Sequence, residues 1–295
     1  MTSVSAPTSP NYLIVINPLP NKKKKQALNR LLVALKTRGW SWRIYETAPN
    51  LTTNQIFFKK HLKQYTDIVA LGGDGTLHII ANCMAHSHVP LAIIPCGTGN
   101  DFARAWFNKE DDPITIALST HSKAIDLGKC NDRYFVNVLG VGFDAELVKQ
   151  LERSKMSYWR SCSYLLKTLM MLPTYQEPTV TIQLENQTVT LPTFIATFAN
   201  SQYFGGGMKI APFASPHNHQ LDYCIIKKAP FFKKLYYLSK VFSGNHLQAN
   251  VVSYGQSQQA VITTCDIPLE ADGEFIGHSP CNISIEANAL RLKTA

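Results

Sequence analysis

The sequence predicts an α/β N-terminal domain built on a doubly wound parallel sheet, followed by a C-terminal all-β sandwich domain. The first 126 or so residues alternate short apolar runs with helix patterns, which is typical of repeated βαβ units. Beyond them, closely spaced strand patterns favour an antiparallel sandwich or barrel. The chain has 295 residues, and this length suits two domains better than one.

In the N-terminal half, apolar strand patterns end in turn or glycine signals. The first run, at 12–16, is followed by Asn17-Pro18, and a lysine-rich segment then leads into a leucine pattern that ends near Gly39, where a helix C-cap is expected. Two later runs lead directly into glycine-rich loops. The predicted strands are residues 12–16, 42–45, 67–71 and 91–94, and the predicted helices start at 22–25, cover 56–62 and 77–84, and follow residue 101.

In the C-terminal half, short strand patterns are interrupted by two helical patterns, at 147–172 and 231–242. We place the nucleotide-binding α/β domain at residues 1–127 and the sandwich at 128–286, with residues 287–295 returning to the first domain. The predicted strands of the sandwich are residues 135–138, 179–184, 188–191, 193–198, 221–226, 260–264 and 282–286.

The composition narrows the class of protein. The formal net charge of +9 favours anionic partners, but no helix pattern presents regularly spaced bases, so nucleic acid is a poor explanation. The seven cysteines form no CxxC pair, so neither a disulfide framework nor a zinc site is indicated. No apolar run is long enough to span a bilayer and the first residues lack signal-peptide features, so we expect a cytoplasmic protein, with peripheral membrane contact as an open alternative.

The strongest chemical signal is GGDGT at 72–76, directly after a predicted strand. Glycines let a phosphate approach the backbone, and the helix that follows offers free N–H groups. Asp74 would repel phosphate unless a cation lies between them, which points to Mg²⁺. Taken alone, a short glycine-rich match is a weak signal, and a plain βα turn is the alternative.

A second glycine-rich loop, GTGND at 97–101, again lies between a predicted strand and a predicted helix. Because the carboxyl ends of parallel strands meet at one edge of a sheet, we expect Asp74 and Asp101 to lie at the same edge. A third acid, Asp126, follows at the end of the predicted domain.

These motifs resemble those of the diacylglycerol kinase catalytic family, and most of all its bacterial soluble lipid kinases. The family also includes sphingosine and ceramide kinases. The resemblance covers most of the chain, from Asn17 to about residue 290. Its motifs are GGDGT at 72–76, IPCGTGNDFAR at 94–104, FDA at 143–145, GGG at 205–207, the spaced AP and A at 211–214, and EADGE at 270–274.

The resemblance implies an ATP-dependent kinase that transfers the γ-phosphate to a lipid hydroxyl, with diacylglycerol as the default acceptor and ATP and Mg²⁺ as cofactors. It implies that Asp272 is the base that accepts the hydroxyl proton and that Asp74, with Asp101 and Asp126, organises the catalytic Mg²⁺. Considered alone, Asp272-Gly273 also reads as a hairpin turn. The implied nucleotide-binding residues are Asn17, Thr47, Gly72, Gly73, Asp74, Gly75, Thr76, Leu77, His78, Gly97, Thr98, Asn100, Asp101 and Asp126.

The sequence departs from the family pattern in three places. One is Ile79, in the predicted helix at 77–84, where the family often has Glu, and the other two are loops. After Asn17-Pro18 the family usually has Ser-Gly, whereas this chain has Leu19-Pro20-Asn21. In the sandwich the family often has Asp-Gly before Leu-Asp, where a second, structural Mg²⁺ binds. This chain has Asn218-His219 there, and Ser215, Asn218 and Gln220 are the candidate ligands.

Two other functions stay open. A kinase of NAD shares GGDGT, although its second loop usually has a different pattern. A catalytically inactive nucleotide- or lipid-binding regulator would explain the altered loops. The expected partner is a lipid at a membrane surface, a homodimer is an open alternative, and the helix pattern at 231–242 either docks on an anionic membrane or packs its apolar face inward.

Overall fold

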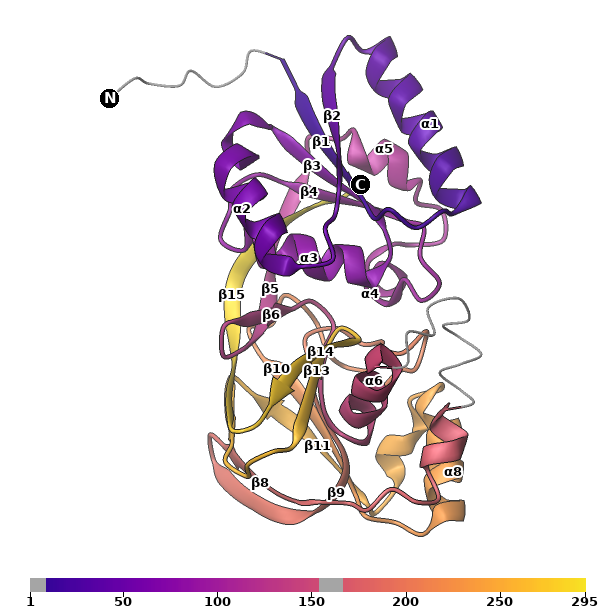
Figure 1. Cartoon of the computed structure of the whole chain (residues 1–295), viewed down its shortest axis with the longest axis vertical. Coiled ribbons are helices and arrows are strands. Elements are labelled where there is room, and N and C mark those ends of the chain that lie inside the picture. Colours follow the sequence, from indigo (N-terminus) through magenta and orange to yellow (C-terminus); the bar gives the residue numbers. More distant parts are fainter. Residues whose placement is uncertain (1–8, 154–166) are drawn as a thin grey trace, which may run out of the picture. The chain divides into compact units, whose positions relative to one another are not determined.

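The computed structural model describes residues 9–153 and 167–295, and the chain divides into two compact units. One unit comprises Met1–Ile125 and Asn288–Ala295, and the other comprises Asp126–Ala287. Strands β5 (Ser122–Cys130) and β15 (Cys281–Lys293) each begin in one unit and end in the other (Figure 1). The domain limits predicted after residues 127 and 286 stay predictions.

The N-terminal unit contains a parallel sheet with strand order β2-β1-β3-β4-β15. Helices cover both faces, which is the doubly wound arrangement that the sequence predicts (Figure 1). The strands are β1 (Asn11–Ile16), β2 (Ser41–Glu46), β3 (Asp67–Gly72) and β4 (Leu91–Pro95). The helices are α1 (Lys22–Thr37), α2 (Leu51–His61), η1 (Leu62–Gln64), α3 (Asp74–Met84), α4 (Asp101–Trp106) and α5 (Pro113–Ala117).

The core of this unit follows from the alternation of side chains along the strands. Tyr12 and Ile14 of β1 pack with Leu31 and Leu35 of α1 in one buried apolar cluster. The buried ammonium of Lys293 in β15 lies 2.5 Å from Asp67 and donates to the carbonyl of Ala117 at 2.9 Å. This buried ion pair joins the last strand to the sheet.

The C-terminal unit consists of two sheets that share the long strand β9 (Gln187–Ala199). One has the order β11-β10-β9-β7-β13-β14, and the other has the order β9-β8-β12-β15-β5-β6. The remaining strands are β6 (Arg133–Phe135), β7 (Val138–Gly142), β8 (Thr179–Leu184), β10 (Leu221–Lys227), β11 (Val252–Ser257), β12 (Gln259–Ile262), β13 (Pro268–Ala271) and β14 (Glu274–His278).

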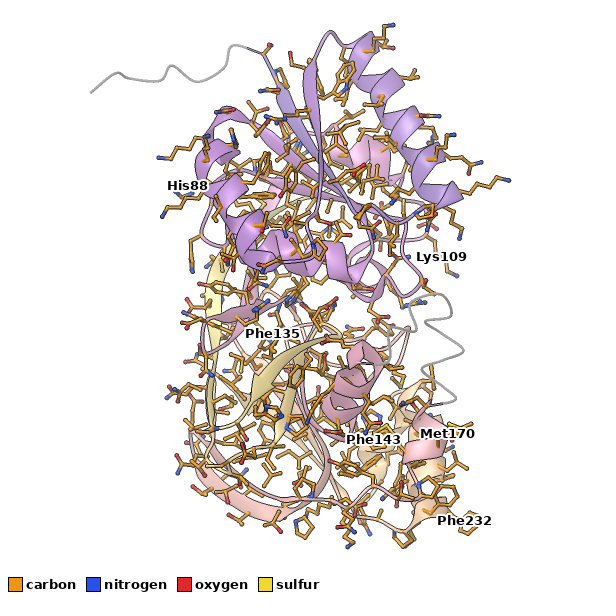
Figure 2. All side chains as sticks on the ribbon, viewed as in Figure 1. His88, Lys109, Phe135, Phe143, Met170 and Phe232 are labelled. Carbon is orange, nitrogen blue, oxygen red and sulfur yellow. The ribbon has the colours of Figure 1, made fainter. Side chains whose placement is uncertain are left out.

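The sandwich has an apolar core between its sheets and a second one under its helices. Phe135 belongs to the core that contains residues of both sheets, and Phe143 belongs to the cluster beneath α6 (Phe143–Arg153) and α8 (Phe231–Val241) (Figure 2). A short 3₁₀ helix, η3 (Asn245–Gln248), follows α8. Together these layers confirm the predicted α/β-plus-sandwich fold class.

Several predicted elements of the sandwich are corrected. The single strand expected at 135–138 is two strands, because the N–H groups of Val136 and Asn137 bind the Asp272 carboxylate instead of a neighbouring strand. The strands expected at 188–191 and 193–198 are one strand, which changes partners from β8 to β10 and β7 near Pro192. Of the helix expected at 147–172, α6 ends at Arg153, residues 167–171 are helical, and the part between them lies outside the described residues.

Within the described ranges, none of the helices has the length and apolar character needed to cross a membrane.

Candidate functional site

The two glycine-rich loops meet at the carboxyl edge of the N-terminal sheet. A Cβ atom on Gly97 would lie 2.5 Å from the Cα of Gly73, and a Cβ on Gly73 would lie 2.8 Å from the Cα of Gly97. The N–H of Cys96 donates to the carbonyl of Gly72 at 2.7 Å, which completes this backbone-to-backbone approach. Both positions therefore require glycine for a steric reason.

Asp74, the first residue of α3, links the first glycine-rich loop to α4, the helix after the second loop. Its Oδ1 accepts hydrogen bonds from the N–H groups of Asp101, at 2.8 Å, and Phe102, at 3.3 Å. These are the first N–H groups of α4, where a negative charge is favourable. The structure thus brings Asp74 and Asp101 into direct contact.

The second loop is closed by Asn100, whose backbone is left-handed with φ 51°. Its Oδ1 accepts from the N–H of Gly97 and its Nδ2 donates to the carbonyl of Gly97, both at 2.8 Å. Asparagine tolerates this conformation and can hydrogen-bond its own turn. Thr98, between them, is exposed and sits at the tip of the loop.

The start of α3 offers polar groups to a ligand. No side chain caps this helix at Gly73, and the buried hydroxyl of Thr76 has no hydrogen-bond partner among the described residues. Leu77 and His78 were also expected to contact the nucleotide. Both are buried, and the Nε2 atom of His78 lies 3.4 Å from Nδ2 of Asn82, so the structure places them in the interior of this unit.

The altered loop after β1 is held by a lysine. The buried Lys24 ammonium donates to the carbonyl and the Oδ1 of Asn17, at 2.6 and 2.7 Å, and also to the carbonyl of Leu19. Asn21 caps α1 and donates to the carbonyl of Cys96 at 2.9 Å. The loop is therefore fixed against the second glycine-rich loop even though it lacks the Ser-Gly of the family.

Two other predicted residues frame this edge. Thr47 follows β2, is buried, and donates its N–H to the carbonyl of Ile16 at 2.8 Å, so it closes the end of β1. Gly75 lies in the first turn of α3, next to Asp74. The structure therefore gathers the predicted residues of this unit around one sheet edge, apart from the buried Leu77 and His78.

The residues at this edge fit a magnesium ion that is shared with a phosphate group. Among the described residues, no group of three or more His, Cys, Asp or Glu side chains is placed to hold a metal. Mg²⁺, however, is usually held by one or two carboxylates together with substrate phosphates. Asp74 and Asp101 are two such carboxylates, beside loops that a phosphate can approach closely.

Asp272 lies in the other unit, at the turn between β13 and β14. Its φ of 52° and the φ of 84° at Gly273 give a tight hairpin turn of the kind that Asp-Gly favours. Its carboxylate accepts the N–H groups of Val136, Asn137 and Val138 at 2.8, 2.7 and 3.3 Å. The backbone of Asp272-Gly273 thus forms the hairpin turn, and three backbone N–H groups hold the Asp272 carboxylate in one position.

Two buried acids beneath this turn were not predicted as site residues. A Cβ on Gly140 would lie 2.1 Å from Oδ2 of Asp144 and 2.4 Å from Oε1 of Glu270, so these oxygens face each other closely. Glu270 also accepts the N–H of Gly273 at 2.7 Å, which ties the pair to the turn. Burial raises the pKa of Asp144 to about 7, and burial followed by the charge of Asp144 raises the pKa of Glu270 well above its usual range.

Asp126 is the first residue of the C-terminal unit, and both of its carboxylate oxygens face His219. Of the candidate ligands for a second metal, Asn218 uses its Oδ1 to accept the N–H of Gln220 at 3.2 Å, and Ser215 precedes this turn. None of these three candidates carries a charge. The residues present do not fit a second Mg²⁺.

A parallel sheet whose carboxyl edge carries two touching glycine-rich loops, each with an aspartate, is typical of a protein that binds the phosphates of a nucleotide. Two family models match the chain. The diacylglycerol kinase catalytic domain matches residues 11–130, and the YegS C-terminal NAD kinase beta sandwich-like domain matches residues 137–294. The chain therefore belongs to the diacylglycerol kinase family of bacterial lipid kinases, phosphotransferases that use ATP as the donor and an alcohol group as the acceptor.

Individual relatives agree with this assignment. The chain is 28% identical to the diacylglycerol kinase of Bacillus subtilis (strain 168) over 281 residues, which cover 90% of each chain. It is 28% identical to the diacylglycerol kinase of Staphylococcus carnosus (strain TM300) over 278 residues, or 91% of this chain and 90% of the relative. A crystal structure of a diacylglycerol kinase from Bacillus anthracis shares the fold, with a TM-score of 0.73, 22% identity and 97% of each chain covered.

Proposed function

We propose that this protein transfers the γ-phosphate of ATP to the free hydroxyl of diacylglycerol. The contact between Asp74 and the start of α4 carries the proposal, because it combines two acid-bearing, phosphate-accessible loops in one site. The acceptor is proposed from the relatives described above, which are named diacylglycerol kinase.

We propose that the phosphates of ATP lie against the loops at 72–76 and 97–101, with Asn17, Thr47 and Thr98 around them. Asp74 and Asp101 would hold Mg²⁺, which would neutralise negative charge on the phosphates when bound. The N–H groups at the start of α3 and the buried Thr76 hydroxyl supply hydrogen-bond donors from the protein itself.

Asp272 is proposed to orient the lipid hydroxyl and to accept its proton. The bond between the γ-phosphorus and the bridging oxygen of ATP breaks, a bond from that phosphorus to the lipid oxygen forms, and ADP leaves. The hydroxyl proton passes to the Asp272 carboxylate and then to solvent. Because the transition state is loose, little deprotonation is needed early, and three backbone donors keep the carboxylate in position to orient the hydroxyl.

We also propose that α8 brings the protein to an anionic membrane surface. Phe232 and Tyr236 of this helix are 80% and 57% exposed, and Met170, in the helical residues 167–171, is 65% exposed (Figure 2). The helix contains no acid, and although its Lys234 is buried and paired with Glu177, its Lys233 is exposed and suits anionic headgroups. Its opposite face packs inward through Phe231, Leu238 and Val241. Leu235 and Phe242, which the inward-packing interpretation also expects inside, are exposed, so that interpretation is wrong for these two residues.

The membrane proposal is tested by flotation with vesicles of phosphatidylcholine with and without phosphatidylglycerol. Phe232→Ser is expected to reduce binding to the anionic vesicles, whereas Ile56→Ser, at an exposed apolar residue on α2, is expected to bind like the parent. Equal binding of both variants would contradict the role of α8.

The decisive experiment for the function is transfer of labelled γ-phosphate from Mg·ATP to a panel of micellar lipids. The panel contains diacylglycerol, phosphatidylglycerol, ceramide and sphingosine, with NAD as a soluble acceptor. Labelled phosphatidic acid is expected. A labelled dinucleotide would instead support the NAD kinase alternative, and ATP binding without any labelled product would support a regulator.

A further inference from the structure

We propose that His219 stands where the family motif places a structural metal ion, and that it positions Asp126 through hydrogen bonds of the protein alone. The loop at residues 215–220 would then need no Mg²⁺ to keep its shape. The consequence for catalysis rests on the proposed function, whereas the metal-free loop does not.

The contacts of Asp126 support this inference. The side chain is 1% exposed. Its Oδ2 accepts the N–H of His219 at 2.9 Å, and its Oδ1 lies 2.9 Å from Nδ1 of the same residue. Because a carboxylate only accepts, the ring nitrogen is the donor. The backbone N–H of Asp126 donates to the carbonyl of Pro216 at 2.8 Å, and the carbonyl of Asp126 accepts from Nδ2 of Asn200 at 2.9 Å. One residue of the loop thus satisfies both oxygens of a buried acid, and a second fixes its backbone.

The backbone of His219 explains why the family motif has glycine here. Its φ is 57°, in the left-handed region that favours glycine, asparagine and aspartate. This conformation directs both the N–H and the ring of His219 at the same carboxylate. Two hydrogen bonds to a buried charge offset the backbone strain, since strained conformations persist where the surroundings over-determine them.

The donors and acceptors of the loop are those of a hydrogen-bonded turn, not of a magnesium site. Mg²⁺ requires oxygen ligands, but donors of His219 occupy the oxygens of Asp126, and Asn218 Oδ1 accepts within the loop. The neighbouring acid, Asp222, is buried and accepts from the Tyr254 hydroxyl and, at 2.9 Å, from Nε2 of Gln256. The carboxylates of Asp126 and Asp222 therefore both accept hydrogen bonds from donors of the protein.

The test is thermal unfolding of the nucleotide-free protein in EDTA and in Mg²⁺. The parent Tm is expected to be the same in both. His219→Gly is expected to lower it by a few degrees, and His219→Asn, which tolerates the backbone and keeps an amide donor, is expected to recover much of this loss. The matched control is Asp266→Gly, at an exposed residue of the same unit with φ 59°, and it is expected to leave the Tm near that of the parent.

A gain-of-metal variant tests the substitution directly. The double variant Asn218→Asp with His219→Gly restores the acid and the glycine of the family motif, and its Tm is expected to rise with Mg²⁺. If the parent Tm itself rises with Mg²⁺, or if the double variant responds no more than the parent, the proposal is overturned. It is also overturned if His219→Gly and Asp266→Gly unfold at the same temperature.

Transfer kinetics separate a positioning role from a purely structural one. At a temperature where each variant is folded, His219→Gly is expected to lower kcat about tenfold or more while KM for ATP stays unchanged, and His219→Asn is expected to restore kcat. An unchanged kcat would overturn the positioning role. If the parent phosphorylates no lipid but the melting pattern holds, the proposed function fails and the metal-free loop stands.

Discussion

Replacing Asp272 by Asn removes the charge of the proposed hydroxyl-orienting residue with the smallest change in shape. In the parent, one carboxylate oxygen accepts the N–H groups of Asn137 and Val138, and the other accepts that of Val136 at 2.8 Å. An amide can keep the first two bonds with its oxygen, but its nitrogen then faces the N–H of Val136, donor against donor. We expect a loss of about 1–3 kcal/mol in the free energy of unfolding.

For a folding unit of this size, each kcal/mol of lost stability lowers the Tm by roughly 2–4 °C. Phosphate transfer is expected to fall by roughly 10²–10⁴-fold, the usual contribution of a general base. The affinity for ATP is expected to stay within a factor of about two, because Asp272 belongs to a different unit from the glycine-rich loops.

The assay is single-turnover transfer of labelled phosphate at saturating ATP, below the melting temperature, with ATP binding measured separately. Asp266→Asn is the control, since Asp266 is an exposed aspartate with φ 59° in the adjoining turn and is expected to react like the parent. Transfer by the Asp272→Asn variant at the parent rate would refute the assignment. A loss of ATP binding in parallel with transfer would refute the separation of roles.

Three further changes test other parts of the site. Gly97→Ala places a Cβ 2.5 Å from the facing backbone and is expected to abolish ATP binding in a titration. Gly39→Ala, at a glycine with a positive φ and open space around it, is expected to lower only the Tm. Lys24→Met leaves the carbonyls of the first loop without their donor, so ATP affinity and Tm are expected to fall, while Lys25→Met at the exposed neighbour is expected to change neither. Because the pKa of Asp144 is raised to about 7, its protonated carboxyl contributes fully to the stability of the fold below pH 3.8, and this contribution is lost as the pH rises through about 7. Asp144→Asn is therefore expected to have a higher Tm than the parent above that pH. Equal slopes of Tm against pH for the two proteins would contradict this.

The N-terminal unit was predictable because its signals are local. Buried parallel strands produce continuous apolar runs, and glycine-rich loops mark where they end. Among the strands of the two C-terminal sheets, β5, β11, β13 and β14 were missed, since they are short, contain Gly or Pro, or lie partly exposed without a clear alternation. The single strand predicted at 135–138 is wrong for another reason. The Asp272 carboxylate, distant in sequence, accepts the N–H groups of Val136 and Asn137 that would otherwise have continued one strand.

The site divides in the same way. The contact between Asp74 and the second loop could be anticipated, because both acids follow neighbouring parallel strands. The pairing of Asp126 with His219 joins residues 93 positions apart, and no local pattern encodes it. Asp144 and Glu270 both lie in the quoted motifs FDA and EADGE, but no local pattern indicates that their carboxyl groups lie close together.

The two altered loops are held in a similar way. The first loop lacks Ser-Gly, and there the Lys24 ammonium donates to the carbonyl and Oδ1 of Asn17. The sandwich loop lacks Asp-Gly, and there His219 donates to the Asp126 carboxylate. In the first case the donor is the Lys24 side chain, and in the second the donors are the backbone N–H and the ring of His219. Altered motifs of this kind indicate an alternative way to fix the loops, so they do not favour an inactive regulator, and Asp74, Asp101, Asp126 and Asp272 are all retained.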